Sequence, residues 1–235
     1  MLAGVFEIIH IASVWVLPVL LSITLHEASH GYIAWKLGDD TALRLGRVTF
    51  NPFKHIDLLG TVLVPGLILL AGSGLGAGLV LFGWAKPVPV NFSRLRNPKR
   101  AMVWVAVAGP GANIFLAAIA GMLIHIIPLF PSWVQGWALA NLQNAILINL
   151  VLAVFNMLPV PPLDGGRVAV GLLPIRFSLV LARLERYGLL IVIGLIFVLP
   201  FIGRSIGVDM SIISWVVGPT VGVLYDTVVA LTGHG

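Results

Sequence analysis

The stretch Leu25-His26-Glu27-Ala28-Ser29-His30 places two imidazoles and a carboxylate inside the first apolar run, which covers about residues 5–35. An ionisable side chain within a hydrocarbon span is costly unless it faces a cavity or a ligand. Residues i and i+4 share one helix face, so His26 and His30 are suited to hold one Zn²⁺. Glu27 then lies beside the metal-bound water as a candidate base. The stretch predicts a helical membrane protein with a metalloprotease site.

The composition agrees with a membrane protein. Of the 235 residues, 59% are apolar and only 10% are charged, and the mean hydropathy is +1.04. A soluble domain carries about 25% charged residues. The net charge of +5 comes from basic residues in the loops between apolar segments, which is typical of cytoplasmic loops and gives no indication of a nucleic-acid partner. Because the chain has no cysteine, a metal must be held by His, Asp or Glu.

Five apolar runs are long enough to span a bilayer, which takes roughly 20 residues of helix. They lie near residues 5–35, 101–127, 137–158, 179–201 and 210–231. A sixth run, 58–83, differs because a cluster of glycines over 72–78 separates two Val- and Leu-rich arms. Such a pattern favours a hairpin at least as much as a helix.

Charge decides how the sixth run is interpreted. Basic residues flank it on both sides: Lys36, Arg44, Arg47 and Lys54 before it, and Lys86, Arg94, Arg96, Lys99 and Arg100 after it. The positive-inside rule places both groups in the cytoplasm. We therefore expect residues 58–90 to enter the membrane and return as a small re-entrant β-hairpin, with the N-terminus outside. The expected fold is an all-α polytopic membrane protein with five to six transmembrane helices. Hydropathy alone does not separate this arrangement from six plain helices.

A catalytic zinc normally has three protein ligands, so a third is needed besides the two histidines. Asp164 is the best candidate. Prolines at 159, 161 and 162 end the preceding helix, and the helix direction brings this segment to the depth of His26 and His30. Gly165 and Gly166 permit conformations that other residues avoid. The alternative is that Asp164 only caps a short helix over 166–173.

Asn113 is a polar residue within the run 101–127, close to Gly109 and other small residues that let a neighbouring helix approach. Its amide is suited to stabilise a developing oxyanion, or to hydrogen-bond between helices. His55 and Asp57, at the entrance of the expected hairpin, are interpreted as a local structural pair.

Taken together, these residues resemble the site-2 proteases, which are zinc intramembrane metalloproteases of peptidase family M50. The resemblance rests on His26-Glu27-x-x-His30, Gly109-Pro110-x-x-Asn113 and Leu163-Asp164-Gly165, and includes the segments 51–57 and 83–91. It covers roughly residues 20–170. The PDZ and CBS domains of several relatives are not present, so the chain resembles a short form. Nothing about the regulation of those relatives carries over.

The resemblance implies that His26, His30 and Asp164 bind one Zn²⁺ per chain, that Glu27 is the catalytic base and acid, and that Asn113 belongs to the catalytic site. It also implies that the re-entrant hairpin over about 58–90 binds substrate. We interpret residues 1–235 as one membrane-embedded metalloprotease domain, with a catalytic core over about 5–173 and two additional spans over 179–231. The expected activity is hydrolysis of peptide bonds within transmembrane segments of substrate proteins. The expected location is the cell membrane, with the active site towards the cytoplasm. The sequence specifies no oligomeric state.

Other function classes fit less well. A metal transporter would carry ligands on both sides of the membrane midplane, whereas these converge at one depth. A catalytically inactive scaffold would have no need for Glu27. An intramembrane protease of the prenyl-processing type would need a later glutamate as third ligand, and Glu185 lies in no such motif.

Overall fold

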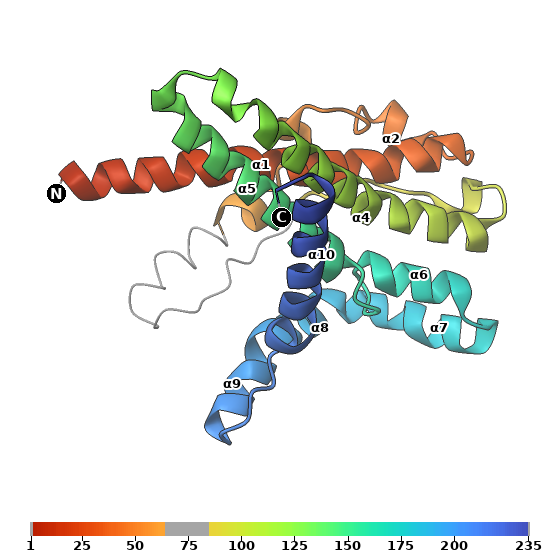
Figure 1. Cartoon of the computed structure of the whole chain (residues 1–235). Helices are drawn as coiled ribbons and strands as arrows, with labels where there is room; N and C mark the ends of the chain where they lie inside the picture. Colours follow the sequence, from red (N-terminus) through yellow and green to blue (C-terminus); the bar gives the residue numbers. More distant parts are fainter. Residues whose placement is uncertain (1, 64–84, 235) are drawn as a thin grey trace.

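Three long helices, α1 (Leu2–Lys36), α4 (Pro98–Leu123) and α5 (Ser132–Asn156), pack against one another and form the centre of the molecule (Figure 1). The computed structural model describes residues 2–63 and 85–234. α4 packs closely against its neighbours because its buried face consists mostly of small residues, among them Ala106, Gly109, Ala117 and Ala120. Small side chains let helix backbones approach closely, which is how helices associate within lipid.

Shorter elements complete the described chain. Between α1 and α4 lie α2 (Thr41–Arg44), η1 (Pro52–Lys54), η2 (Leu58–Leu63) and η3 (Phe92–Arg94), and η4 (Ile124–Leu129) joins α4 to α5. After α5 come α6 (Asp164–Leu172), α7 (Ile175–Leu184), η5 (Glu185–Tyr187), α8 (Gly188–Ile193), η6 (Gly194–Val198), α9 (Leu199–Ser205), η7 (Ile213–Val217) and α10 (Gly218–Leu231). α10 packs on α5, and α9 points away from the central helices (Figure 1).

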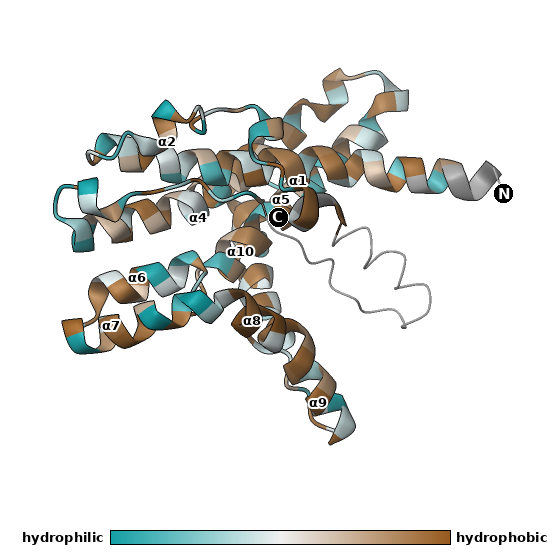
Figure 2. Cartoon of the chain, turned by 180° about the vertical axis from the view of Figure 1, so that it is seen from behind, coloured by the Kyte–Doolittle hydropathy of each residue, from teal (hydrophilic) through white to brown (hydrophobic). Residues whose placement is uncertain are grey.

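Five helical segments of the described chain are long and apolar enough to cross a membrane: Ile9–Lys36, Pro98–Leu129, Ser132–Asn156, Ile175–Ser205 and Ile213–Leu231. They correspond to the five apolar runs found in the sequence. Large apolar side chains cover their outer surfaces, as with Trp104, Phe115 and Phe201, which are 65%, 65% and 74% exposed, and Figure 2 shows hydrophobic residues along α8 and α9. Since soluble proteins rarely expose so much contiguous apolar surface, the chain is a multi-pass membrane protein.

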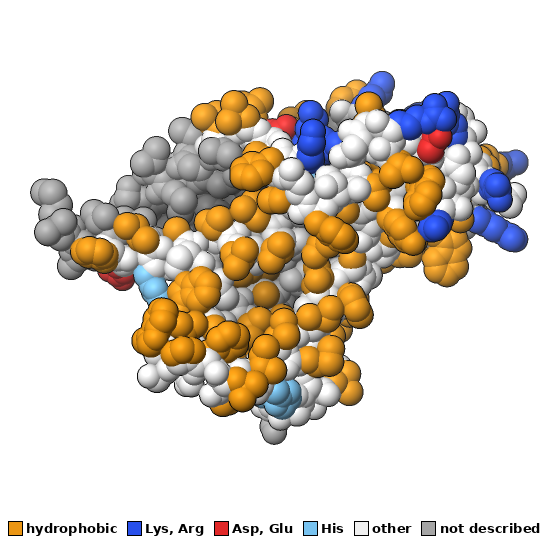
Figure 3. All heavy atoms as spheres, turned by 90° about the horizontal axis from the view of Figure 1, so that it is seen from above, with side chains coloured by type: hydrophobic (Ala, Val, Ile, Leu, Met, Phe, Trp, Pro, Cys, Tyr) orange, Lys and Arg blue, Asp and Glu red, His pale blue; other side chains and the backbone are white. Residues whose placement is uncertain are grey.

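Basic side chains gather at one end of the molecule. In Figure 3, Lys and Arg cluster at one end of the face shown, while hydrophobic side chains cover most of the remainder. α1 ends at Lys36, and α4 begins with Pro98-Lys99-Arg100, so the end of one span and the start of the next both carry positive charge. This distribution is the one that the positive-inside rule associates with the cytoplasmic side.

The prediction of a re-entrant β-hairpin over 58–90 is wrong. No described residue belongs to a β-strand, and the first arm begins as the π-helical turn η2. Asp57 favours this start because its Oδ1 accepts a 2.8 Å hydrogen bond from the N–H of Gly60, as the N-cap of a helix does. Residues 85–91 belong to no helix or strand. Pro87 and Pro89 lack the N–H groups that one edge of a strand ladder requires. Residues 64–84, which hold the expected tip, lie outside the described residues.

Candidate metal centre

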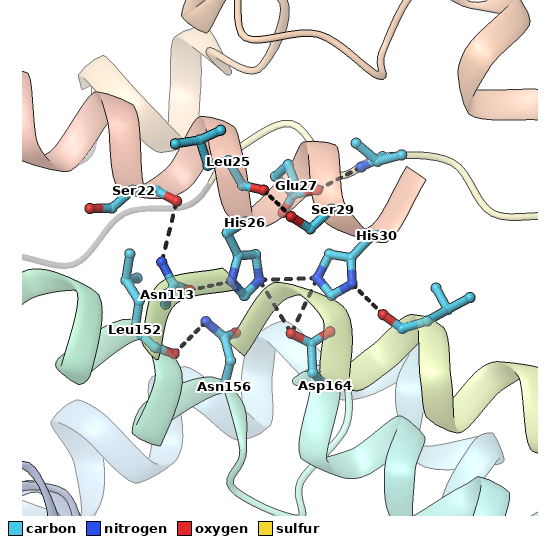
Figure 4. A network of polar contacts seen from close by, with 12 residues as sticks. Ser22, Leu25, His26, Glu27, Ser29, His30, Asn113, Leu152, Asn156 and Asp164 are labelled. Carbon is cyan, nitrogen blue, oxygen red and sulfur yellow. Dashed lines mark hydrogen bonds and ion pairs between the residues drawn. The ribbon is translucent and has the colours of Figure 1, made fainter. Parts of the chain in front are cut away.

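His26 and His30 lie one turn apart on the buried face of α1, as their spacing predicted. Their side chains point towards α4 and α6, and the residues are 6% and 7% exposed. The two Nε2 atoms are 3.1 Å apart, and the rings meet edge to face with centroids 4.7 Å apart. Both ring nitrogens that face the interior of the site therefore converge on one point (Figure 4).

Asp164 reaches the same point from the other side of the site (Figure 4). Its Oδ2 lies 3.2 Å from Nε2 of His26 and 3.3 Å from Nε2 of His30. α5 ends at Asn156, before the three prolines, and Asp164 is the first residue of α6. The N-cap position of α6 is taken by Leu163, so Asp164 lies inside the first turn of the helix and not at its cap. The alternative that Asp164 serves only as a helix cap is therefore not supported.

The two glycines after Asp164 are required for space. Neither has a positive φ among the described backbone angles, contrary to the conformational reason expected from the sequence. A Cβ on Gly166 would lie 2.5 Å from the backbone nitrogen of Pro161, and one on Gly165 would collide with the carbonyl of Met157. Their absence of side chains lets the start of α6 pack against residues 157–161, which brings the Asp164 carboxylate to the histidines.

The two histidines carry their protons on Nδ1, which leaves both Nε2 atoms free to bind a cation. Nδ1 of His26 lies 2.6 Å from Oδ1 of Asn113, and Nδ1 of His30 lies 2.7 Å from the carbonyl oxygen of Val105. Because these two oxygens only accept hydrogen bonds, each Nδ1 carries the proton and each Nε2 presents a lone pair. Oδ2 of Asp164 is buried and has no hydrogen-bond partner among the described residues. Three acceptor atoms thus face one another without a donor.

Distances among these three atoms also fit zinc. Tetrahedral Zn²⁺ with ligands at about 2.0–2.1 Å keeps its ligand atoms about 3.3–3.4 Å apart, close to the 3.1–3.3 Å separations here. Gly109 of α4 borders the same volume. A Cβ at this position would lie 2.5 Å from Nε2 of His30 and 2.7 Å from Nε2 of His26. The residues present therefore fit a zinc ion, and Gly109 leaves room for it.

Glu27 lies beside the two histidines on α1 and is partly buried. Its Oε2 accepts a 2.8 Å hydrogen bond from the backbone N–H of Val88, in the extended segment that precedes η3. Figure 4 marks this contact as a dashed line from Glu27. A carboxylate held by a backbone amide next to a metal-binding site is suited to take up and return a proton.

The comparisons with known proteins agree with this geometry. The model of "Peptidase family M50" matches residues 121–199. YwhC of Bacillus subtilis, provisionally named a zinc metalloprotease, is 39% identical over 189 residues, which cover 79% of this chain and 80% of YwhC. The chain belongs to peptidase family M50.

More distant relatives carry the same kind of name. Rip2 of Mycolicibacterium smegmatis and Rip2 of Mycobacterium tuberculosis, both provisionally named zinc metalloproteases, are 29% and 31% identical to this chain. The alignments cover 75% and 69% of this chain but only 64% and 56% of those proteins. No solved structure shows a significant match.

In this M50 peptidase, Asn113 connects the metal site to the neighbouring helices. Its Nδ2 donates to Oδ1 of Asn149 at 2.8 Å and to the carbonyl oxygen of Ser22 at 3.3 Å. Its Oδ1 faces His26 (Figure 4). The hydrogen bonds between helices expected for Asn113 are therefore present, and its role towards a developing oxyanion stays a prediction.

Sequence reasoning missed the residues that hold the M50 peptidase's extended segment beside Glu27. Arg47, only 8% exposed, donates from Nη2 to the carbonyl oxygens of Lys86 at 2.6 Å and Pro87 at 3.4 Å. The N–H of Lys86 donates to the carbonyl oxygen of His55 at 2.9 Å. In the sequence, the only signal for these contacts was that segments 51–57 and 83–91 both belong to the pattern of the same family. That pattern did not show that the two segments contact each other.

Asp39 holds the far end of the same segment. It is fully buried, its Oδ2 accepts from the N–H of Asn91 at 2.6 Å, and its Oδ1 accepts from the N–H and hydroxyl of Thr41. Burial alone would raise the pKa of Asp39, but the hydrogen bonds from Thr41 and Asn91 outweigh it and hold that pKa below its usual value.

His55 is structural. It is 2% exposed, and its Nε2 donates to the carbonyl oxygen of Thr49 at 3.2 Å. Burial lowers the pKa of His55, so its ring is held neutral.

Proposed function

We propose that this protein is a zinc-dependent intramembrane endopeptidase that hydrolyses peptide bonds within transmembrane segments of membrane proteins. The observation that carries the proposal is the convergence of three buried acceptor atoms, from His26, His30 and Asp164, between helices apolar enough to span a membrane. Membership of family M50 supports zinc as the metal and proteolysis as the activity. A transporter of metal ions, the alternative, is not favoured by the relatives.

His26, His30 and Asp164 would hold the zinc ion, one per chain. When bound there, zinc lowers the pKa of a coordinated water to about 7 and polarises the carbonyl of the scissile bond. The Nδ1–H groups of both histidines donate to oxygens of α4, which fixes the rings with Nε2 towards the ion. The anionic Asp164 offsets part of the positive charge in a site of low dielectric constant.

Glu27 would move the proton. Its carboxylate accepts a proton from the attacking water and gives it to the amine of the leaving peptide. The hydrogen bond from Val88 to Oε2 holds the carboxylate in one orientation, so this proton transfer needs no search among rotamers.

Substrate would reach the site from the membrane. Lys36 lies at the basic end of α1, six residues after His30. Six residues of α-helix extend about 9 Å along the helix axis. We place this basic end at the cytoplasmic face of the cell membrane, so the site lies just beneath that surface. A transmembrane helix of a substrate hides its carbonyls in hydrogen bonds to residues four positions along. It must therefore unwind locally before attack, and helix-weakening residues near the scissile bond should favour cleavage.

The test uses the full chain in liposomes with a membrane-embedded reporter substrate. Glu27→Gln is expected to keep one zinc per chain and to lose cleavage, whereas Asp164→Asn is expected to lose zinc. Glu185→Gln serves as the control, because Glu185 pairs with Arg167 at an exposed site. Unimpaired cleavage by Glu27→Gln would remove the assigned base, and full zinc retention by Asp164→Asn would remove the assigned ligand.

A further inference from the structure

A line of buried polar side chains runs from α5 through α4 to the metal site. Asn149 of α5 and Asn113 of α4 are 3% and 0% exposed, and they connect to His26 of α1. The hydrogen bonds along this line measure 2.8 Å from Asn113 Nδ2 to Asn149 Oδ1 and 2.6 Å between Asn113 Oδ1 and His26 Nδ1. Three neighbouring helices therefore share one polar connection within an otherwise apolar interior.

The direction of every hydrogen bond in this line is fixed from its α5 end. Asn149 Nδ2 lies 2.8 Å from the carbonyl oxygen of Ala145, which only accepts. The other end of the Asn149 amide, Oδ1, must then face Asn113 and accept from its Nδ2. Consequently Oδ1 of Asn113 faces His26, Nδ1 of His26 carries the proton, and Nε2 presents its lone pair to Asp164. The orientation follows from the network rather than from an arbitrary choice of amide rotamer.

The opposite orientation would work against a metal ion. If the Asn113 amide were flipped, its NH₂ group would face Nδ1 of His26, and the imidazole proton would move to Nε2. That proton would point at Asp164, and it would have to leave before a metal could bind. Ser22 offers a second acceptor for the Asn113 NH₂ group, but at 3.3 Å it is the longer of the two contacts. Asn149 therefore supplies the stronger restraint on the flip.

We propose that Asn149 is a positioning residue for the metal ligand His26 and acts on it through Asn113. The inference rests on the proposed function, because it assumes that His26 binds zinc. Among the described residues, Asn149 makes side-chain hydrogen bonds to Asn113 and to the carbonyl of Ala145, and none to Glu27 or to the three candidate ligands. It selects the tautomer of His26 that can bind a metal, in the way that hydrogen-bond partners behind other metal ligands fix ring orientation.

Zinc affinity of the detergent-solubilised full chain, measured by competition with a chromogenic chelator, tests the proposal without reference to proteolysis. Asn149→Leu is expected to weaken zinc binding by about 10- to 100-fold. Asn149→Asp keeps an oxygen that accepts from Asn113, so it is expected to bind zinc close to the wild-type affinity. If Asn149→Leu does not fold, Asn149→Ala removes the same acceptor with a smaller side chain and is expected to give the same loss.

Asn141→Leu is the matched control. Asn141 lies on the same helix, is 8% exposed, and likewise donates from Nδ2 to the carbonyl four residues before it, that of Trp137. Among the described residues, Asn141 makes no hydrogen bond to His26, Asn113 or Asp164. Asn141→Leu is expected to leave the zinc affinity unchanged, and a loss equal to that of Asn149→Leu would overturn the proposal in favour of a general effect on α5.

A double-mutant cycle separates positioning from simple helix packing. Since Asn149 acts only through Asn113, Asn113→Leu with Asn149→Leu should bind zinc no more weakly than Asn113→Leu alone. Cobalt substitution adds a spectroscopic signature, because displacement of His26 changes the visible absorption of Co²⁺ in Asn149→Leu but not in Asn141→Leu. Additive losses in the cycle, or wild-type affinity in Asn149→Leu, would overturn the proposal while leaving the protease assignment intact. A wild-type chain without zinc would instead overturn the protease assignment.

Discussion

The backbone N–H of Val88 donates a 2.8 Å hydrogen bond to Oε2 of Glu27, a residue 61 positions earlier in the chain. Val88 lies in a segment that Arg47 holds through the carbonyl oxygens of Lys86 and Pro87. Among the described residues, Arg47 makes no hydrogen bond to Glu27, His26 or His30. The orientation of the proposed base thus depends on a buried arginine in the loop after α1.

Arg47→Ala is therefore expected to lower kcat about 10- to 100-fold while zinc stoichiometry stays at one per chain, because the segment that holds Glu27 loses its anchor. Steady-state cleavage of a membrane-embedded substrate, with metal analysis of the same samples, checks this. Arg44→Ala is the control, since Arg44 at the end of α2 is only three residues away but is largely exposed and pairs with Asp40. Loss of zinc in Arg47→Ala, or an equal loss of kcat in Arg44→Ala, would contradict the assignment.

Gly109→Ala is expected to weaken zinc binding about tenfold or more, because the added methyl group lies within contact of both Nε2 atoms and overpacking of this kind is costly. Chelator competition measures the affinity. Gly111→Ala is a close control, since a Cβ at Gly111 meets nothing within 4 Å and the residue lies on the same helix. Equal zinc affinities for the two variants would show that the volume beside Gly109 is not the metal's.

Removal of the metal should lower the melting temperature. Three acceptor atoms face one another at 3.1–3.3 Å in the site, and an ion that binds the folded state but not the unfolded state stabilises the fold by mass action. Thermal unfolding in detergent is expected to shift downwards with a strong chelator and to recover with added Zn²⁺. Asp164→Asn should respond to neither addition; a full zinc response in that variant would point to another site.

Stability should also depend on Asp39 in a defined pH range. The pKa of Asp39 is lower in the folded protein than in the unfolded chain, where it is about 3.9. Its contribution is therefore complete above about pH 5 and is lost progressively as the pH falls through the folded-state pKa. Asp39→Asn should melt well below the wild type at pH 7, with a smaller difference at pH 3. If the difference in melting temperature between wild type and Asp39→Asn is the same at pH 7 and pH 3, the proposed role of the carboxylate is contradicted. Asp209→Asn, in an exposed loop, serves as the control.

Much of the fold and site followed from local patterns in the sequence. The apolar runs located the five helices that can span a membrane, because span length is set by bilayer thickness and composition. The spacing of His26 and His30 placed both on one helix face. The prolines after Asn156 ended α5 and brought Asp164 to the depth of the histidines, as expected. The start of the sixth run was misjudged because its Val- and Leu-rich composition suits strand or helix, while Asp57 caps a helical turn.

The sequence by itself determined which residues can bind a metal, since ligand chemistry, helix periodicity and hydrophobic length are local properties of the chain. Only the tertiary structure decided how those residues are oriented. Asn149 meets Asn113 across 36 positions, and Arg47 meets Lys86 across 39. Contacts of this kind depend on how the helices and the intervening segment pack in three dimensions. No spacing rule along the chain predicts which amide or guanidinium will be buried against which carbonyl.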